Sequence, residues 1–311
     1  MNDKIWLITG GTGFIGSGLL KKLNNNPENH IIILTRNPNQ PKVIELLQKA
    51  KFAENISFVQ NLDKIPETTF INYIINLAGN PITGRWTQKV KEEIVRSRLS
   101  VTKALVNLVA RLKKKPEVFI SGSAIGYYGY GGDTPLDEDS PAQSVFISEL
   151  CQAWEKQAEL VKQYNVRYSA IRTGVVLGLE GGMIQQVLPA YRFFLGGPIG
   201  DGKQWLSWIH IDDYLSLIEF LVQHTDLSGP FNGTAPNPVQ YNTFSEIFSR
   251  TLNRPNICRL PAFVIRSLFG EMGEALLLHG QRVIPKRAIE SGFQFKYETL
   301  DKALNQLFDN Q

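Results

Sequence analysis

Apolar runs and longer amphipathic stretches alternate along the first 178 residues of the chain. The apolar runs are short and rich in isoleucine, which is typical of strands buried on both faces of a parallel sheet. The stretches between them place apolar residues at helical spacing. The runs that predict strands are Ile5–Thr9, Ile31–Thr35, Ile56–Gln60, Tyr73–Leu77, Val118–Ser121 and Arg167–Thr173.

The longest amphipathic stretches predict helices at about 88–113 and 144–164, and a shorter one at 17–23 follows the first strand. Strands that alternate with helices in this way form a parallel sheet with helices on both faces. The pattern therefore predicts an α/β fold of the Rossmann type, with a doubly wound parallel sheet.

Glycine and proline become frequent after Gly178, and the regular alternation ends there. We expect residues 179–206 and 236–311 to form a smaller C-terminal lobe that binds the substrate. Residues 207–235 predict a helix and a short strand that return to the first domain. This NADP(H)-binding domain would consist of residues 1–178 and 207–235.

Closely spaced glycines stand where the first predicted strand becomes a helix. Without a Cβ, Gly11 and Gly13 allow a tight turn and a close approach of phosphate, and Gly16 lets the helix pack near the strand. The free N–H groups at a helix start attract an anion. An alternative is a glycine-rich turn without a ligand. We interpret the segment as the pyrophosphate site of a dinucleotide, formed by Gly10, Gly11, Thr12, Gly13, Phe14, Ile15 and Gly16.

The end of the second predicted strand indicates which dinucleotide binds. NAD sites place an Asp or Glu about 20 residues beyond the glycines, whereas NADP sites have a basic residue nearby. Here the strand ends in Thr35, Arg36 and Asn37, and the next carboxylate is Glu45. Arg36 can hold a 2′-phosphate bidentately, and Thr35 or Asn37 can add a further hydrogen bond, although an arginine at a strand end is often only solvated. We therefore predict that the cofactor is NADP(H).

Composition adds few constraints. The 311-residue chain is 43% hydrophobic with a net charge of +4, and its basic residues are scattered, so we expect no nucleic-acid partner. Cys151 and Cys258 predict neither a disulfide framework nor a metal site. The early first strand leaves no room for a signal peptide, and no apolar run reaches the length of a membrane span. We expect a cytoplasmic protein without membrane contact.

Motifs that follow the strands resemble those of the extended short-chain dehydrogenases/reductases. They are Asn76–Gly79, Ser121–Ala124, Ile171–Gly174 and Trp208–Asp213. Other motifs are similar to the subgroup of nucleoside-diphosphate-sugar epimerase-like, or "epimerase family", proteins: Arg85-Trp86, Ser97-Arg98, Gly126–Gly129, Trp154-Glu155, Gly196–Gly202 and Pro285–Arg287. The resemblance covers nearly the whole chain.

This resemblance implies cofactor contacts from Leu77, Ala78, Gly79, Arg172 and Gly174. It also implies that the two long helices can pair two subunits in a homodimer. The resemblance identifies a specific family, but it does not identify the substrate.

Catalysis in that superfamily uses a Tyr-x-x-x-Lys pair as the acid and base, together with a serine that contacts the substrate oxygen. This chain lacks the pair, because the corresponding helix reads Phe146-x-x-x-Leu150. Ser123 matches the catalytic serine. Tyr127 and Tyr128 follow it closely and are candidate proton donors, with a pocket wall as the alternative role.

Candidate substrate-binding residues are Arg85, Trp86, Lys203 and His210. His210 is alternatively an orienting or capping residue at a helix start, where Asp212 or Asp213 would be the N-cap. The arginines at positions 85, 96 and 98 can meet a phosphate or carboxylate of a substrate, or pair with acidic neighbours on the helix surface.

Together these features predict an NADP(H)-binding oxidoreductase or epimerase that transfers hydride at a carbinol or carbonyl of an unidentified small molecule. The missing Tyr-x-x-x-Lys pair leaves a second hypothesis open. In that hypothesis the protein is a catalytically inactive NADP(H)-binding redox sensor or interaction module. Ser123, the glycine loop and the substrate lobe favour the enzyme.

Overall fold

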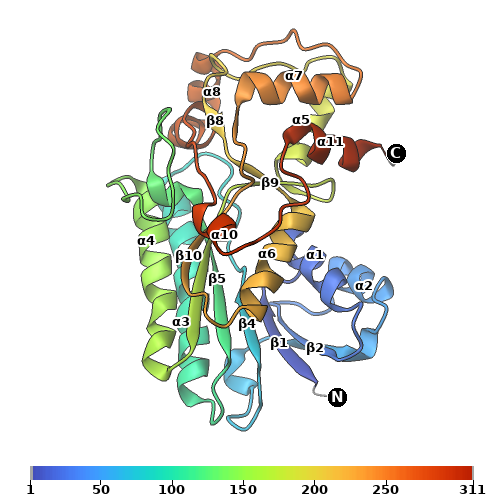
Figure 1. Cartoon of the computed structure of the whole chain (residues 1–311), viewed down its shortest axis with the longest axis vertical. Helices are drawn as coiled ribbons and strands as arrows, with labels where there is room; N and C mark the ends of the chain where they lie inside the picture. Colours follow the sequence, from blue (N-terminus) through green and yellow to red (C-terminus); the bar gives the residue numbers. More distant parts are fainter. Residues whose placement is uncertain (1–2, 310–311) are drawn as a thin grey trace.

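The computed structural model describes residues 3–309. Within this range a seven-stranded parallel sheet has the order β10-β6-β5-β4-β1-β2-β3 (Figure 1). Its strands are β1 (Lys4–Thr9), β2 (Asn29–Leu34), β3 (Ile56–Val59), β4 (Tyr73–Asn76), β5 (Val118–Ala124), β6 (Arg167–Thr173) and β10 (Gly229–Gly233). This topology confirms the predicted Rossmann-type fold.

The strand order reverses between β1 and β4. From β1 the chain moves through β2 to β3 on one side, and then crosses to β4, β5 and β6 on the other. In such sheets ligands bind beyond the carboxyl ends of the strands, at the point where the order reverses. This edge of the sheet carries the glycine turn and Ser123, at the ends of β1 and β5.

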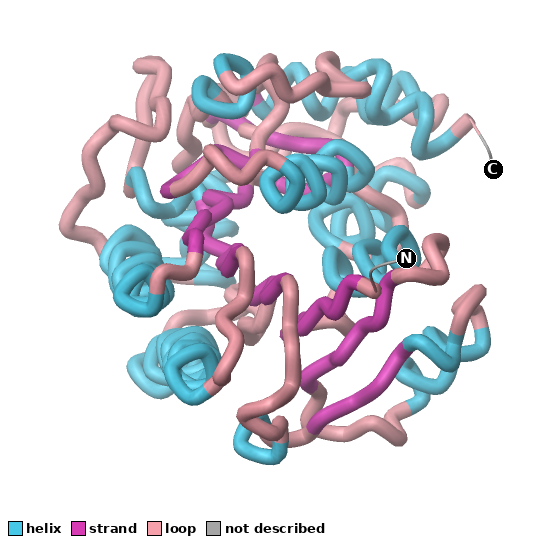
Figure 2. Tube along the Cα trace, turned by 60° about the horizontal axis from the view of Figure 1, so that its bottom comes forward, coloured by secondary structure: helices cyan, strands magenta, loops and turns pink. Residues whose placement is uncertain are grey.

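Helices cover both faces of the sheet (Figure 2). One face packs against α1 (Phe14–Leu23) and α6 (Ile211–Gln223), and the other against α3 (Gln88–Arg111) and α4 (Phe146–Glu159). Helix α2 (Pro41–Gln48) packs its apolar side near β2. Neighbouring residues of β1 enter different apolar clusters, Ile8 with α1 and α6 and Leu7 with α3. Burial on both sides explains why the strand sequences are continuously apolar.

The bounds of most elements differ from the prediction by one to a few residues, and the differences in β5 and α4 affect the site. Strand β5 continues past Ser121 to Ala124, because Gly122 to Ala124 still pair with β6. Helix α4 begins at Phe146 and ends at Glu159, after which 160–164 form a 3₁₀ turn. The longer β5 makes Ser123 part of a strand.

The C-terminal part of the chain surrounds a third apolar cluster that includes Trp208, Phe244 and Leu304. Its helices are α5 (Gly182–Arg192), α7 (Tyr241–Thr251), α8 (Ala262–Phe269), α9 (Glu271–Gly273), α10 (Lys286–Glu290) and α11 (Leu300–Phe308). Its strand pairs are β7 (Val175–Leu177) with β9 (Trp208–His210), and β8 (Trp205–Leu206) with β11 (Val239–Gln240). Figure 1 places α5, α7, α8 and α11 above the sheet. The exact division of the chain into two domains stays a prediction.

A fourth apolar cluster connects α3 and α4 to the C-terminal part. In it Trp86, Ile94, Ile147 and Leu150 meet Met272 of α9. Within residues 3–309 we find no helix with both the length and the apolar character needed to cross a membrane.

Candidate cofactor and active site

The turn between β1 and α1 is built so that only glycine fits at two of its positions. Gly10 has a φ of +70°, and a Cβ there would lie 2.5 Å from the carbonyl oxygen of Leu77. A Cβ on Gly16 would lie 2.2 Å from the carbonyl oxygen of Gly10. These approaches bring the start of α1 directly against the ends of β1 and β4.

The start of α1 offers free donors to an anion. Gly13 is the N-cap, no side chain caps the helix, and its first turn contains no acidic residue. The N–H groups of Phe14, Ile15 and Gly16 therefore have no intrahelical acceptor. A Cβ on Gly13 would approach only the Gly10 carbonyl, at 3.1 Å, so its other side is open. The turn fits the pyrophosphate of a dinucleotide.

The side chains of the loop have other neighbours. The ring of Phe14 lies against the segment before α5, because a Cβ on Gly178 or Gly181 would come within 2.7 Å of it. Ile15 packs on the apolar cluster beneath α1, and Thr12 is half-buried. The backbone N–H groups at the start of α1 are therefore the expected contacts to the phosphates.

Arg36 stands exposed just after β2. Its guanidinium makes no hydrogen bond or ion pair within residues 3–309. Thr35 is buried, and its N–H donates to the carbonyl of Val59 at 3.0 Å. The side chain of Asn37 accepts a hydrogen bond from the N–H of Asn39 at 3.0 Å, as in an Asx turn. Arg36 is therefore the group of this segment that is available to a ligand.

The loop after β4 is tied to β1. The N–H of Leu77 donates to the carbonyl of Thr9 at 3.1 Å, and that of Ala78 donates to the Thr9 hydroxyl at 3.2 Å. The same hydroxyl donates to Asn76 at 2.7 Å. These bonds hold Leu77, Ala78 and Gly79 beside the glycine turn.

Ser123 belongs to a buried ion-pair network. Its hydroxyl donates to Glu155 Oε1 at 2.6 Å. Arg172 binds the same carboxylate through Nε at 2.9 Å and Nη2 at 3.0 Å. Because α4 carries Glu155 and β6 carries Arg172, the network joins a helix to two neighbouring strands.

The guanidinium of Arg172 is engaged within the protein, and its predicted cofactor contact stays a prediction. Its third nitrogen, Nη1, donates to the hydroxyl of Tyr128 and the carbonyl of Glu138, each at 3.1 Å. Burial opposes its charge, but the hydrogen bonds and charge of Glu155 outweigh burial and raise the pKa of Arg172. All its nitrogens are thus occupied within the protein. Gly174 is also a packing residue, since a Cβ there would lie 2.5 Å from the Ser207 carbonyl.

The two candidate tyrosines differ in availability. Tyr128 is 1% exposed, and its hydroxyl donates to Asn232 at 2.6 Å. Burial raises the pKa of this phenol. Tyr127 is half-buried, its ring lies 3.4 Å from the Arg172 guanidinium carbon, and its hydroxyl has no hydrogen-bond partner within residues 3–309. Tyr127 is the better placed of the two to contact a ligand.

Two of the four predicted substrate residues, His210 and Trp86, are buried. His210 is 1% exposed, and its Nδ1 accepts from the N–H of Asp212 at 3.1 Å. It is itself the N-cap of α6, the role that we expected from Asp212 or Asp213. Trp86 packs in the fourth cluster and donates to the Ile82 carbonyl at 2.8 Å. Arg85 and Lys203 are exposed.

Sequence reasoning did not include Glu155 and Asn232 among the site residues. Glu155 follows Trp154 in one of the epimerase-like motifs, but its role in the site depends on Arg172, which lies opposite it. Asn232 lies on the distant strand β10 and accepts a hydrogen bond from the Tyr128 hydroxyl. Local sequence pattern carries no information on such long-range pairs.

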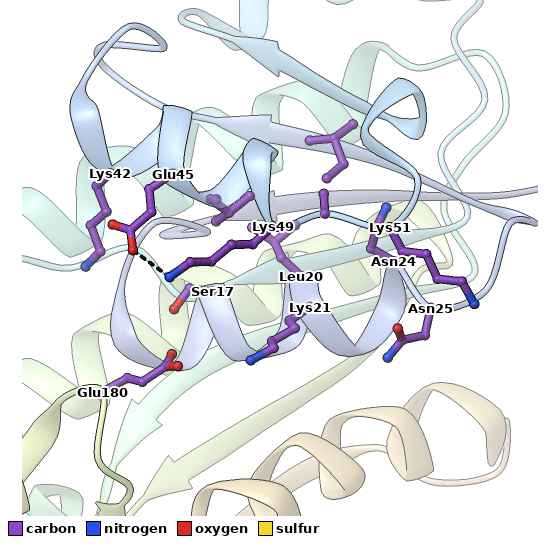
Figure 3. A pocket seen from close by; sticks show the side chains of 13 residues that line it. Ser17, Leu20, Lys21, Asn24, Asn25, Lys42, Glu45, Lys49, Lys51 and Glu180 are labelled. Carbon is purple, nitrogen blue, oxygen red and sulfur yellow. Dashed lines mark hydrogen bonds and ion pairs between the residues drawn. The ribbon is translucent and has the colours of Figure 1, made fainter.

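A pocket of about 460 Å³ opens between α1 and α2 (Figure 3). Its floor includes Leu20, Leu46 and Ile56, and the ion pair of Glu45 with Lys49, at 2.6 Å, lies in it. None of the predicted site residues lines this pocket. We therefore do not assign the cofactor to it.

Residues 6–232 match the model of the NAD dependent epimerase/dehydratase family, and residues 260–307 match a domain of unknown function, DUF1731. The chain therefore belongs to the NAD dependent epimerase/dehydratase family. It is 39% identical to the epimerase family protein YfhF of Bacillus subtilis, with 96% of each chain covered. The chloroplastic epimerase family protein SDR39U1 homolog of Arabidopsis thaliana is 38% identical, over 96% of this chain and 84% of the relative.

A solved structure agrees with these relationships. The human epimerase family protein SDR39U1, isoform 2, crystallised with NADPH, superposes with a TM-score of 0.87 at 30% identity. The match covers 99% of this chain and 100% of the human one. The extended short-chain dehydrogenase/reductase class predicted from the motifs is confirmed.

Proposed function

We propose that the protein is an NADP(H)-dependent oxidoreductase or epimerase that transfers hydride at a carbinol or carbonyl carbon. The observation that carries this proposal is the position of Ser123. Its strand lies two places from β1, a distance of about 10 Å across the sheet. Ser123 is thus near the glycine turn, at the same edge.

The choice of NADP(H) over NAD(H) rests on Arg36. A free guanidinium at the end of β2 suits the 2′-phosphate that distinguishes the two cofactors. The similar human protein was crystallised with NADPH, which supports the same choice. The N–H groups of Phe14, Ile15 and Gly16 would hold the pyrophosphate.

When bound, the cofactor supplies or accepts the hydride. The protein has to position the substrate oxygen and move its proton. Since the Ser123 hydroxyl donates to Glu155, its lone pairs are left to accept a hydrogen bond from a carbinol hydroxyl. Arg172 fixes the carboxylate bidentately and so fixes the direction of the serine proton. Tyr127 is the candidate acid that would protonate a carbonyl oxygen.

A test measures NADPH oxidation at 340 nm across aldehydes, ketones, quinones and nucleotide sugars. Ser123→Ala should lower turnover about 100-fold while NADPH affinity stays nearly unchanged, because the hydroxyl group that forms at the reacting carbon loses the acceptor that positions it. Tyr127→Phe should cost roughly 100-fold or more if this phenol is the acid. Tyr128→Phe is the matched control, and circular dichroism checks the folding of each variant.

A binding module is the second candidate function. The engaged hydroxyl of Tyr128 favours it, because that phenol already serves the fold. If no compound in the panel is turned over above background, and NADPH changes the affinity of the protein for a partner, the binding module replaces the enzyme.

A further inference from the structure

Arg98 of α3 carries a charge without a carboxylate partner. Its Nη1 donates to the Ile94 carbonyl at 3.2 Å and to the Ser97 hydroxyl at 3.5 Å. Its Nε and Nη2 donate no hydrogen bond within residues 3–309, and no Asp or Glu of that range forms an ion pair with it. The side chain of Arg98 is half-buried, and burial lowers the pKa of its guanidinium.

Gly79 leaves room for this guanidinium. A Cβ on Gly79 would lie 3.0 Å from its Cζ, 3.1 Å from Nη2 and 3.3 Å from Nε. Because these distances are nearly equal, the Gly79 backbone lies over the flat face of the group. The ring of Trp154 lies 5.2 Å from the same carbon. The guanidinium is held by its face, while the edge formed by Nε and Nη2 remains without an acceptor.

Both neighbours belong to the proposed active site. Gly79 ends the loop that is bonded to β1 beside the glycine turn. Trp154 precedes Glu155, which accepts the hydrogen bond of the Ser123 hydroxyl. A Cβ on Gly122, the residue before Ser123, would lie 3.2 Å from the Trp154 ring. Arg98 is therefore close to both the cofactor loop and the serine.

We propose that Arg98 binds a carboxylate group of the substrate, so that the substrate is an acid whose reacting carbon stands at Ser123. The inference rests on the proposed function and adds the substrate class. A partly buried cation that lacks an anionic partner destabilises the folded protein, and a bound anion offsets this loss of stability. The Nε–Nη2 edge matches the two oxygens of a carboxylate. The cofactor pyrophosphate is already served by the start of α1.

The first test does not depend on turnover. Line broadening in fluorine NMR compares trifluoroacetate with the neutral trifluoroacetamide on the NADP⁺-saturated protein. We expect the acid to bind and the amide not to bind. Arg98→Gln should weaken the acid about tenfold to a hundredfold, whereas Arg98→Lys should keep part of the affinity because it keeps the charge. Lys103→Gln, which removes an exposed charge from the same helix, is the matched control.

Several outcomes contradict this inference. They are equal broadening by acid and amide, no binding of the acid at millimolar concentration, or an acid affinity that Arg98→Gln leaves unchanged. If Arg98→Gln weakens NADPH itself and not the acid, the anion at Arg98 belongs to the cofactor, and the proposal is wrong. NADPH affinity and circular dichroism of each variant are measured first.

A second test separates this inference from the proposed function. Carbonyl compounds are assayed as matched pairs of free acid and methyl ester. We expect wild type to prefer the acids in kcat/KM, and Arg98→Gln to remove that preference. Turnover without any acid preference would contradict the role of Arg98 and leave the proposed function standing. Binding of the acid without turnover of any compound would contradict the proposed function instead.

Discussion

At the scale of single residues, the proposal that the cofactor is NADP(H) rests on the free charge of Arg36. We expect the wild-type protein to bind NADPH more tightly than NADH. Arg36→Ala should reduce NADPH affinity about tenfold to a hundredfold, the usual effect of losing a charge-assisted contact, and leave NADH affinity nearly unchanged. Fluorescence titration of both cofactors measures the difference. Equal affinities in the wild type would contradict the assignment of NADP(H).

The two cysteines should react differently with iodoacetamide. Burial raises the pKa of the Cys151 thiol to about 12. The thiolate is the reactive form, so Cys151 should stay unmodified at mildly alkaline pH, while the more accessible Cys258 is alkylated. In urea both should react. The Cys151 thiol ionises more easily in the unfolded chain than in the folded one. The free energy of unfolding should therefore fall as the pH rises above 9.0, the ordinary pKa of a thiol. Peptide mass spectrometry reads the labelling.

At the scale of elements, the glycine turn has two separable requirements. An alanine methyl at Gly16 would collide with the Gly10 carbonyl, so Gly16→Ala should destabilise folding by roughly 1–3 kcal/mol. Gly13 has an extended backbone that alanine can adopt, and the nearest atom to its added carbon is 3.1 Å away. Gly13→Ala should therefore fold normally and lose NADPH affinity. Urea unfolding and cofactor titration distinguish the two, and normal NADPH binding by Gly13→Ala would indicate a structural turn only.

The regular elements could be predicted from sequence because they are local. Strands buried on both faces, such as β1, are continuously apolar, and α3 repeats its apolar residues over many turns. The site was less predictable. Gly10 and Gly16 belong to a local motif, whereas the roles of Glu155, Arg172 and His210 depend on residues far away in the chain. Ser123 was found through its motif, but its partner was not.

At the scale of the whole molecule, the predicted homodimer stays a prediction. The exposed positions of α3 include Lys89, Glu92, Arg96, Ser100 and Lys103, which are all polar. If α3 takes part in a dimer, charged groups would make much of that contact, and salt should weaken it. Sedimentation at low and high salt measures this.

Phe14 connects the proposed cofactor site to the C-terminal part of the chain. Its N–H begins α1, and its ring supports Gly178 and Gly181, just before α5. We expect NADPH to slow amide hydrogen exchange in α5 as well as in α1, because holding the start of α1 also steadies the ring. Exchange mass spectrometry with and without NADPH measures this. Protection confined to α1 would show that the connection is not used.

The contact between Phe14 and the glycines before α5 has a consequence for kinetics. If the bound dinucleotide already orders the segment before α5, a second ligand that contacts this segment loses less conformational entropy when it binds. We therefore expect an ordered kinetic mechanism, in which the dinucleotide binds before the substrate and dissociates after the product. Product inhibition by the oxidised dinucleotide should then be competitive with NADPH and noncompetitive with the substrate.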